Sequence, residues 1–556
     1  MDFNRYFRNE ELETTLKEWK GQYKTLLSID TIGKSHEGRP IWVAVVTNKE
    51  TGPDKEKPAV WIDANIHATE IAGTTTSMSI IHALISGYGK DNQATRLLDT
   101  SVFYVVPRLN PDGAELALAD SPLYIRSSAR PYPWDEKEEG LHVQDIDGDG
   151  RILQMRIEDP TGEWKVSSLD PRLMEKRKPD EQAGIFYRLL QEGLIEDYDG
   201  YQIKVANPYQ SLDFNRNFPV EWRPEDEQKG AGPYPTSEPE IKAMVDFIVT
   251  HPNINAAIAY HTFSGVILRP PSTHPDEEMD ANDLWVYKAI GKRGTDLVGY
   301  PNVSVYHDFR YHPKQVIAGV FDDWMYNHLG IFAFTVELWD IISRAGIEER
   351  KYIEWLRDHP HEDDHKILKW VDKNAGEDGY VDWYEFDHPQ LGKVEIGGWN
   401  RMYTWENPPY NLMKEEAERN IPFALALGDM LPHLEISTLE VNRIEEGTYH
   451  INLVVDNSGF FPTYTNNQGQ TRKTIRPLRV ELEIPEDVEI INGKRKSELG
   501  HLEGRSNKIG QIFVLSSPTD NRARIEWVLK APKDSKLIIH IKSERAGMIH
   551  KEVTLI

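Results

Sequence analysis

The sequence contains no cysteine among its 556 residues. Disulfide bonds and thiol catalysis are therefore excluded, although this absence leaves the compartment open. A run of about eighteen apolar residues, which a membrane-spanning helix needs, is also missing, so we expect no membrane span. Residues 1–6 lack a basic region followed by an apolar one, which predicts a cytoplasmic protein on the sequence as given. A secreted or periplasmic protein whose leader had been removed would look the same.

Positive charge is scarce, because 64 Lys and Arg residues stand against 90 Asp and Glu residues and give a formal net charge of −26. Such a surface would repel phosphate groups over most of its area, so we expect no nucleic-acid partner. The length is sufficient for two or three domains with an ample buried core.

A short apolar run at residues 59–66, rich in aromatic and branched side chains, predicts a buried strand that ends at His67. Glu70 follows where this strand gives way to a helix. A catalytic zinc ion takes three protein ligands, commonly imidazole nitrogens and carboxylate oxygens, and keeps one position for water. His67 and Glu70 would supply two ligands, but a His and an acid at a strand-to-helix turn are also common without a metal.

Two further apolar segments, 256–260 and 331–336, lead into His261 and Glu337. A lone acid inside an apolar strand is rare unless it is paired or functional. In an open parallel sheet, ligands gather outside the carboxyl ends of the strands. We therefore expect His261 as a third metal ligand and Glu337 as a general base beside it.

Six motifs, in order over about residues 1–345, resemble the zinc carboxypeptidases of the pancreatic carboxypeptidase A type. They are His67-x-x-Glu70, Asn110-Pro111-Asp112-Gly113, Asp213-Phe214-Asn215-Arg216-Asn217-Phe218, Ser237-Glu238-Pro239-Glu240, His261 and Phe334-Thr335-Val336-Glu337-Leu338. The resemblance implies zinc bound by His67, Glu70 and His261, a ligand set known for carboxypeptidase A, and Glu337 as the residue that activates water. With its segments beyond these motifs, the chain resembles a bacterial-like, multidomain member of this family.

The same resemblance implies how a substrate is held. Asn215 and Arg216 correspond to the pair that binds the free terminal carboxylate of a peptide, for which the planar guanidinium is well suited. Arg126 stands about where the family places the arginine that polarises the scissile carbonyl, and such a group stabilises the developing oxyanion. Arg130 is the competing candidate for this role.

Two further substrate-binding residues follow from the aligned positions. Asp322 occupies the position that sets specificity in the family, and an acid there would favour a C-terminal Lys or Arg. The mobile tyrosine of the family has no clean counterpart, because its aligned place falls near Lys314 and Gln315. Tyr311 is the candidate substitute.

Residues 127–210 form a predicted insertion with a possible calcium loop. Asp145, Asp147 and Asp149 stand at loop positions one, three and five, and the backbone carbonyl of Arg151 stands at position seven. The expected Glu at position twelve is replaced by Arg156, so another carboxylate would be needed. An acidic hairpin turn without an ion is the alternative.

A rival metal motif, H-E-x-x-H, occurs at residues 361–365. Pro360 precedes it, and both variable positions are Asp, which is typical of the first turn of a solvated helix. We favour that interpretation over a zinc site of the zincin type.

The order of the predicted elements divides the chain into three parts. Strands alternating with helices over residues 1–345 predict an α/β fold with a mixed, mostly parallel sheet sandwiched by helices. Residues 346–434 predict a helical and loop-rich extension packed on this domain. Residues 435–556 contain alternating apolar and polar runs and predict an all-β, immunoglobulin-like sandwich, which could contact a peptide, a glycan or another protein.

These observations predict a zinc-dependent carboxypeptidase that acts on peptides with a free C-terminus. An amidase or a cell-wall peptide hydrolase on the same scaffold is one alternative. A non-catalytic binding protein is another, although the complete His, Glu, His and Glu set argues against it.

Overall fold

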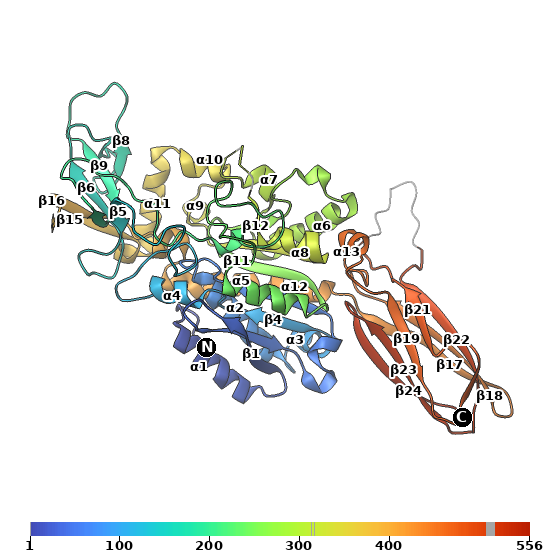
Figure 1. The fold of residues 1–556 in the computed structure, drawn as a ribbon. Coiled ribbons are helices and arrows are strands. Elements are labelled where there is room, and N and C mark those ends of the chain that lie inside the picture. Colours follow the sequence, from blue (N-terminus) through green and yellow to red (C-terminus); the bar gives the residue numbers. More distant parts are fainter. Residues whose placement is uncertain (1, 313, 316, 507–517) are drawn as a thin grey trace.

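A computed structural model describes residues 2–312, 314–315, 317–506 and 518–556. At its centre lies a mixed eight-stranded sheet (Figure 1). Its strands, in spatial order, are β1 (Leu27–Lys34), β2 (Pro40–Val46), β4 (Val102–Val106), β3 (Ala59–Ala64), β11 (Ile254–Thr262), β14 (Phe332–Leu338), β12 (Val266–Arg269) and β13 (Asn302–Ser304). Strands β4, β3, β11 and β14 are parallel, whereas β2 and β12 run antiparallel to them on either side. The predicted α/β fold with a mixed sheet is therefore confirmed.

The inner strands are buried on both faces. In β3, Val60 and Ile62 belong to one hydrophobic core, whereas Ala59 and Trp61 belong to a second core on the opposite face. Because successive side chains of a strand point to opposite faces, a continuously apolar strand must be covered on both sides. The first face is covered by α1 (Asn9–Gln22), α2 (Ala72–Gly87), α3 (Asn92–Thr100), α6 (Ala281–Val298) and α12 (Tyr410–Met430), and the second by α5 (Pro239–Val249) and α8 (Phe321–Leu329).

The insertion and the extension together form a six-stranded sheet. Its strands, in spatial order, are β15 (Tyr380–His388), β16 (Gly392–Trp399), β6 (Gln154–Glu158), β9 (Tyr187–Gln191), β7 (Trp164–Val166) and β8 (Met174–Lys176). Residues 380–399 thus form a hairpin within the extension, 346–434, that we expected to be helical and loop-rich. Strand β16 pairs with β6, which lies far away in the sequence, so local composition could not reveal this partner. The insertion also contains a separate pair, β5 (Gly140–Val143) with β10 (Gly193–Glu196).

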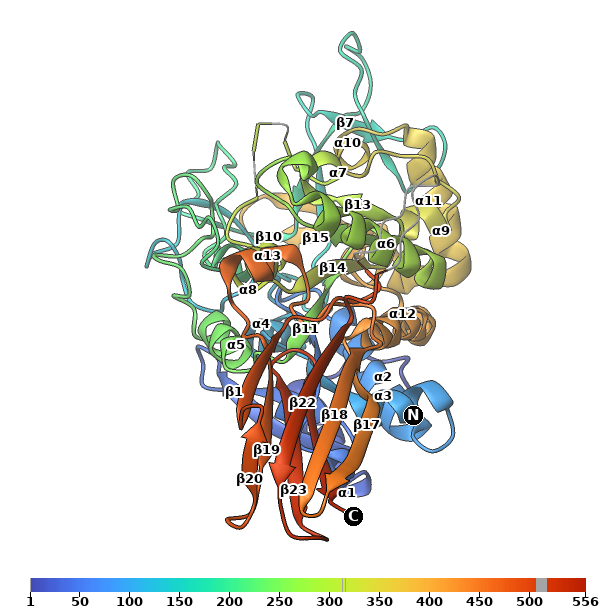
Figure 2. The ribbon, with the colours of Figure 1, turned by 90° about the vertical axis from the view of Figure 1, so that its right-hand side faces the viewer.

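Two four-stranded antiparallel sheets make up the C-terminal part of the chain. One contains β17 (Leu434–Glu445), β18 (Thr448–Asn457), β22 (Arg522–Lys530) and β20 (Glu489–Asn492), and the other β21 (Lys496–Gly500), β19 (Leu478–Glu483), β23 (Lys536–Ser543) and β24 (Gly547–Thr554). They share one core around Trp527 and Tyr449. An all-β sandwich is therefore present. Figures 1 and 2 place it at the opposite end of the molecule from the six-stranded sheet.

Further helices and turns complete the fold. They are α4 (Pro111–Ala117), α7 (Val305–Asp308), α9 (Ile341–Arg344), α10 (Tyr352–Arg357), α11 (His361–Asn374) and α13 (Asn467–Arg472), with the single turns η1 (Lys49–Thr51), η2 (Asp54–Glu56), η3 (Phe214–Arg216), η4 (Asp276–Glu278), η5 (Gly376–Asp378) and η6 (Met402–Glu406). In the described chain, no helix combines the length and the apolar character that crossing a bilayer requires.

Candidate active site

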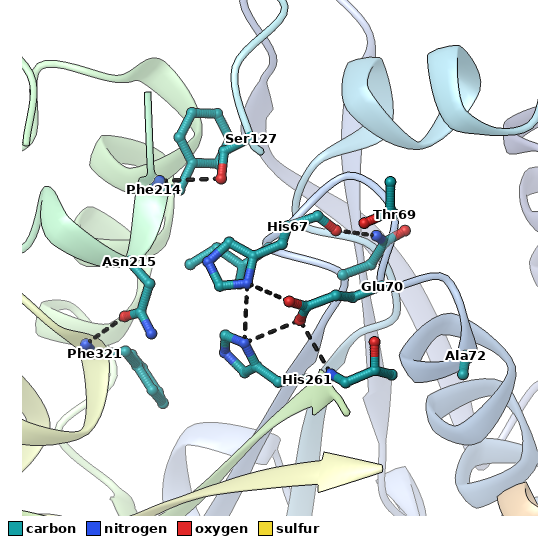
Figure 3. Close-up of polar contacts among 12 residues, drawn as sticks. His67, Thr69, Glu70, Ala72, Ser127, Phe214, Asn215, His261 and Phe321 are labelled. Carbon is teal, nitrogen blue, oxygen red and sulfur yellow. Dashed lines mark hydrogen bonds and ion pairs between the residues drawn. The ribbon is translucent and has the colours of Figure 1, made fainter. Parts of the chain in front are cut away.

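Three buried side chains meet at the carboxyl edge of the central sheet. Nδ1 of His67 lies 2.7 Å from Oε1 of Glu70, and Nδ1 of His261 lies 3.1 Å from Oε2 of the same carboxylate. The two Nδ1 atoms are 3.2 Å apart, and Figure 3 shows both rings turned toward Glu70. Two imidazole nitrogens and one carboxylate are a donor set that zinc accepts, with a further position left for water. The residues present therefore fit a zinc ion.

The charges of these groups also suit a cation. Burial opposes the ionisation of Glu70, but His67 and His261 outweigh it and hold the pKa of Glu70 well below its usual range. Burial also disfavours the charged form of His261, and it therefore lowers the pKa of this imidazole. Metal binding needs an ionised carboxylate and a neutral imidazole, and the directions for Glu70 and His261 agree with this need.

The turn after β3 presents the first two donors. Asn65 has a left-handed backbone, with φ of 57°, a conformation that Asn adopts more readily than most residues. Its Nδ2 donates a hydrogen bond to the carbonyl oxygen of His67 at 2.6 Å. Glu70 is fixed from the neighbouring strand, because the Thr262 N–H at the end of β11 donates to its Oε2 at 3.1 Å. The strand end and the turn together orient the donors.

Asp213 is a site residue that our sequence analysis did not single out. Nε2 of His67 lies 3.0 Å from its Oδ1, and Nε of Arg126 donates to its Oδ2 at 3.0 Å. Burial disfavours the ionised form of Asp213. Arg126, Arg216 and His67 nevertheless keep its pKa well below the usual range. A carboxylate on the far nitrogen of a ligating histidine fixes the tautomer and the ring orientation. The sequence could have indicated Asp213, because this residue directly precedes Phe214 and Asn215 in one of the motifs that resemble the family.

Glu337 lies in the same pocket as the two histidines. Its Cα pairs with that of His261 across the parallel strands β11 and β14, so both side chains leave the same face. Its Oε2 is shielded from solvent and has no hydrogen-bond partner among the described residues. Burial, followed by the charge of Glu70, raises the pKa of Glu337 well above its usual range. With Glu70 and Asp213, the site thus holds two strongly ionised carboxyl groups, and Glu337 is one that readily keeps a proton.

The predicted substrate residues line one small pocket of about 50 Å³ with His67, His261 and Glu337. They are Arg126, Asn215, Arg216, Tyr311 and Asp322. Oδ1 of Asn215 accepts a hydrogen bond from the Phe321 N–H at 2.9 Å (Figure 3). Burial raises the pKa of Asp322 to about 6. The competing Arg130 points elsewhere, since its Nη2 donates to Oε1 of Glu238 at 2.6 Å.

The predicted calcium loop has internal partners. Oδ1 and Oδ2 of Asp145 accept hydrogen bonds from the N–H groups of Gly148 and Gly150 at 2.7 and 2.9 Å. The guanidinium of Arg151 lies 2.7 Å from Oδ2 of Asp149 and supplies positive charge to the loop. Asp145, Asp147 and Asp149 are still close enough to share an ion. Calcium binding here stays a prediction.

The H-E-x-x-H segment begins helix α11. Nδ1 of His361 lies 3.0 Å from Oδ2 of Asp364, and its Nε2 lies 2.6 Å from Oγ of Ser167. Within the described ranges, the groups of three donors that could hold an ion are the histidine–glutamate site and the Asp145 loop, and neither includes His361.

Comparison with known proteins gives a family match. A family model described as zinc carboxypeptidase matches residues 12–140 and 175–354, and one described only as a domain of unknown function matches residues 433–554. Carboxypeptidase B2 of Rattus norvegicus is 25% identical over 351 residues, which cover 61% of this chain and 64% of that protein. Carboxypeptidase A2 of Rattus norvegicus is 25% identical over 382 residues, covering 65% and 72%. The structure of carboxypeptidase A from Helicoverpa armigera has a TM-score of 0.40 at 17% identity and covers 67% of this chain and 76% of its own.

Proposed function

Because this chain belongs to the zinc carboxypeptidase family, we propose that it hydrolyses the C-terminal peptide bond of peptides with a free carboxyl terminus. The proposal depends above all on one observation: His67 and His261 line one pocket with Glu337 and Arg216, and the carboxylate of Glu70 contacts both histidines. A metal-assisted reaction on a substrate that ends in a carboxylate needs this combination.

In this proposal His67, Glu70 and His261 hold the zinc ion, which supplies a Lewis acid for the scissile carbonyl and lowers the pKa of water. Glu337 takes a proton from the attacking water and transfers it to the leaving amine, a role suited to a carboxyl group with a raised pKa. Arg126 donates hydrogen bonds to the carbonyl oxygen, where negative charge develops.

Arg216 and Asn215 bind the terminal carboxylate of the substrate. Because Oδ1 of Asn215 already accepts from Phe321, its Nδ2 amide is the group left to donate. Asp322, in the same pocket, favours a C-terminal Lys or Arg, whose positive charge would stabilise its ionised form. Tyr311, whose side chain is exposed by nearly half, donates a further hydrogen bond to the substrate.

Peptides of one sequence with free and with amidated C-termini test this proposal. We expect amidation to reduce kcat/KM by about 100-fold, because the buried Arg216 loses its charged partner. Glu337→Gln is expected to lose about 10²- to 10⁴-fold in kcat while it still binds zinc. Glu240→Gln is the matched control, since Glu240 is also a buried acid, with a pKa raised to about 7, but lies on α5.

Each alternative gives a different result in the same assays. Equal hydrolysis of free and amidated peptides would indicate an amidase, and activity restricted to cell-wall peptides would indicate a cell-wall hydrolase. Zinc binding without hydrolysis of any peptide would indicate a binding protein and contradict the proposal.

The finer features of the chain remain proposals of the same kind. We propose a catalytic domain over residues 1–345 with its insertion at 127–210, an extension over 346–434 and an immunoglobulin-like sandwich over 435–556. The two antiparallel sheets support the last assignment, and we expect the sandwich to contact a peptide, a glycan or another protein. A calorimetric calcium titration, with Asp145→Ala as the comparison, tests the calcium loop.

A further inference from the structure

A much larger pocket, of about 920 Å³, adjoins the small pocket of the active site. The two share Arg126, which lines both of them. Asn215, Arg216 and Asp322 lie on the side of the small pocket, which has room for little more than a terminal residue. A longer substrate held by its terminal carboxylate must therefore leave the site past Arg126, in the direction of the larger pocket.

Aromatic side chains form much of this larger pocket, which we call the aromatic-acidic groove. Tyr124, Tyr132, Trp134, Tyr209 and Trp222 all line it. The side chain of Trp134 is 64% exposed. A large aromatic side chain costs free energy when it is left in water, and a cluster of them around a concave surface marks a binding site.

The walls of the groove are already positioned. The hydroxyl of Tyr209 donates to the carbonyl oxygen of Asp135 at 2.8 Å, and Tyr132 N–H donates to the carbonyl oxygen of Tyr209 at 3.0 Å. Elsewhere in the lining, Nε1 of Trp222 donates to the carbonyl oxygen of Ala231 at 3.0 Å. A surface held in this way binds without a large cost in ordering its own side chains.

The groove also carries an excess of negative charge. Glu136, Glu138, Glu225 and Asp226 line it, and Lys229 and Arg126 are the cationic side chains among its lining residues. Arg126 is occupied by Asp213 and Glu70. Among the residues that the structure describes, none makes an ion pair or a hydrogen bond with the side chain of Glu136 or Asp226. These two carboxylates are free to meet a positive charge from a ligand.

We propose that the aromatic-acidic groove binds the substrate residues that precede the C-terminal residue and selects basic side chains there. The inference rests on the proposed carboxypeptidase function and adds the class of substrate: cationic peptides. Lys and Arg side chains pair with the free carboxylates, and they also stack on the exposed ring of Trp134.

The test uses three peptide series that share one C-terminal residue and carry Lys, Gln or Glu at the three preceding positions. We expect kcat/KM for the Lys series to exceed that for the Glu series by about tenfold or more at low salt, which corresponds to about 1.4 kcal/mol. The ratio should fall as the salt concentration rises, because these charges are partly exposed.

The double variant Glu136→Gln with Asp226→Asn is expected to reduce this ratio to about threefold or less. Glu446→Gln with Glu486→Gln is the matched control, because it removes the same two charges from exposed positions on the distant sandwich. It should leave the ratio unchanged. Trp134→Ala should lower kcat/KM for the Lys series by about fivefold, whereas Trp285→Ala, at another exposed tryptophan, should not.

Equal kcat/KM for the three series, or a control pair that reduces the ratio as much as the groove pair does, would overturn the proposal. If the protein hydrolyses no peptide, the carboxypeptidase proposal fails by itself. Fluorescence anisotropy of the same labelled peptides then decides the groove separately, since tighter binding of the Lys series that depends on Glu136 and Asp226 would still support it.

Discussion

Three carboxyl groups within the site differ in protonation because their neighbours differ. Glu70 lies beside His67 and His261, and Asp213 lies beside Arg126 and Arg216, so both have a lowered pKa in spite of burial. Glu337 faces the charge of Glu70 in a buried position and has a raised pKa. Environment, and not residue type, therefore sets which of these carboxyl groups is ionised and which readily keeps a proton.

At this scale, Asp213→Asn is expected to lower zinc affinity or kcat by about 10- to 100-fold. The amide can still contact His67, but it loses the negative charge that makes the imidazole a stronger ligand and that holds Arg126 in place. Competition with a chelator gives the zinc affinity. Asp63→Asn is the control, since Asp63 is a buried acid on β3 whose pKa is raised to about 7 and whose Oδ1 accepts from Nε1 of Trp61. Unchanged affinity and kcat in Asp213→Asn would refute the orienting role.

At the scale of elements, the pairing of β16 with β6 joins the insertion to the extension. Nε of Arg156 donates to Oε2 of Glu395 at 2.8 Å, and its guanidinium lies over the rings of Trp383 and Tyr187 at 4.6 and 5.1 Å. Arg156 thus holds the sheet together at the position where a calcium loop would need an acid. This structural role accounts for the departure from the calcium-loop pattern.

Arg156→Ala is expected to lower the free energy of unfolding by about 2 kcal/mol. Glu395 would lose its ion-pair partner, and the rings of Trp383 and Tyr187 would lose the guanidinium that packs on them. Chemical denaturation followed by tryptophan fluorescence measures the change. Arg188→Ala is the matched control: Arg188 also pairs with an acid, Asp159, at 3.0 Å, but its side chain is 41% exposed. A loss no larger than that of the control would show that the pair does not join the two segments.

At the scale of the whole molecule, the sandwich docks on the catalytic unit through α13, which lies against α6 and α8 (Figure 1). Asp283 of α6 accepts hydrogen bonds from the N–H groups of Asn467 and Gln468 at 2.9 and 3.0 Å, and from the Tyr326 hydroxyl at 2.9 Å. Burial raises the pKa of Asp283 to about 6. One carboxyl group therefore links the two units and titrates near neutral pH.

This pKa predicts a pH dependence of stability. A carboxyl group whose pKa is raised on folding stabilises the folded state fully below its unfolded value, about 3.8, and this contribution is lost as the pH rises through about 6. Relative to Asp283→Asn, the protein should therefore be more stable at pH 4.5 than at pH 7, by about 2 kcal/mol. Denaturation of both proteins across this range measures the difference. A constant difference between the two proteins would contradict the prediction.

The sequence by itself determined the α/β class and the positions at which polar residues end apolar strands, because both depend on patterns within a few residues. His67, Glu70, His261 and Glu337 could be selected in this way, and the order of their motifs indicated the family. Tertiary structure decided which distant groups meet. Asp213 reaches His67 across 146 positions and Glu395 reaches Arg156 across 239, so neither contact leaves a local pattern. The groove beside Arg126 likewise exists only where separate loops converge, since its shape and charge are properties of the folded surface.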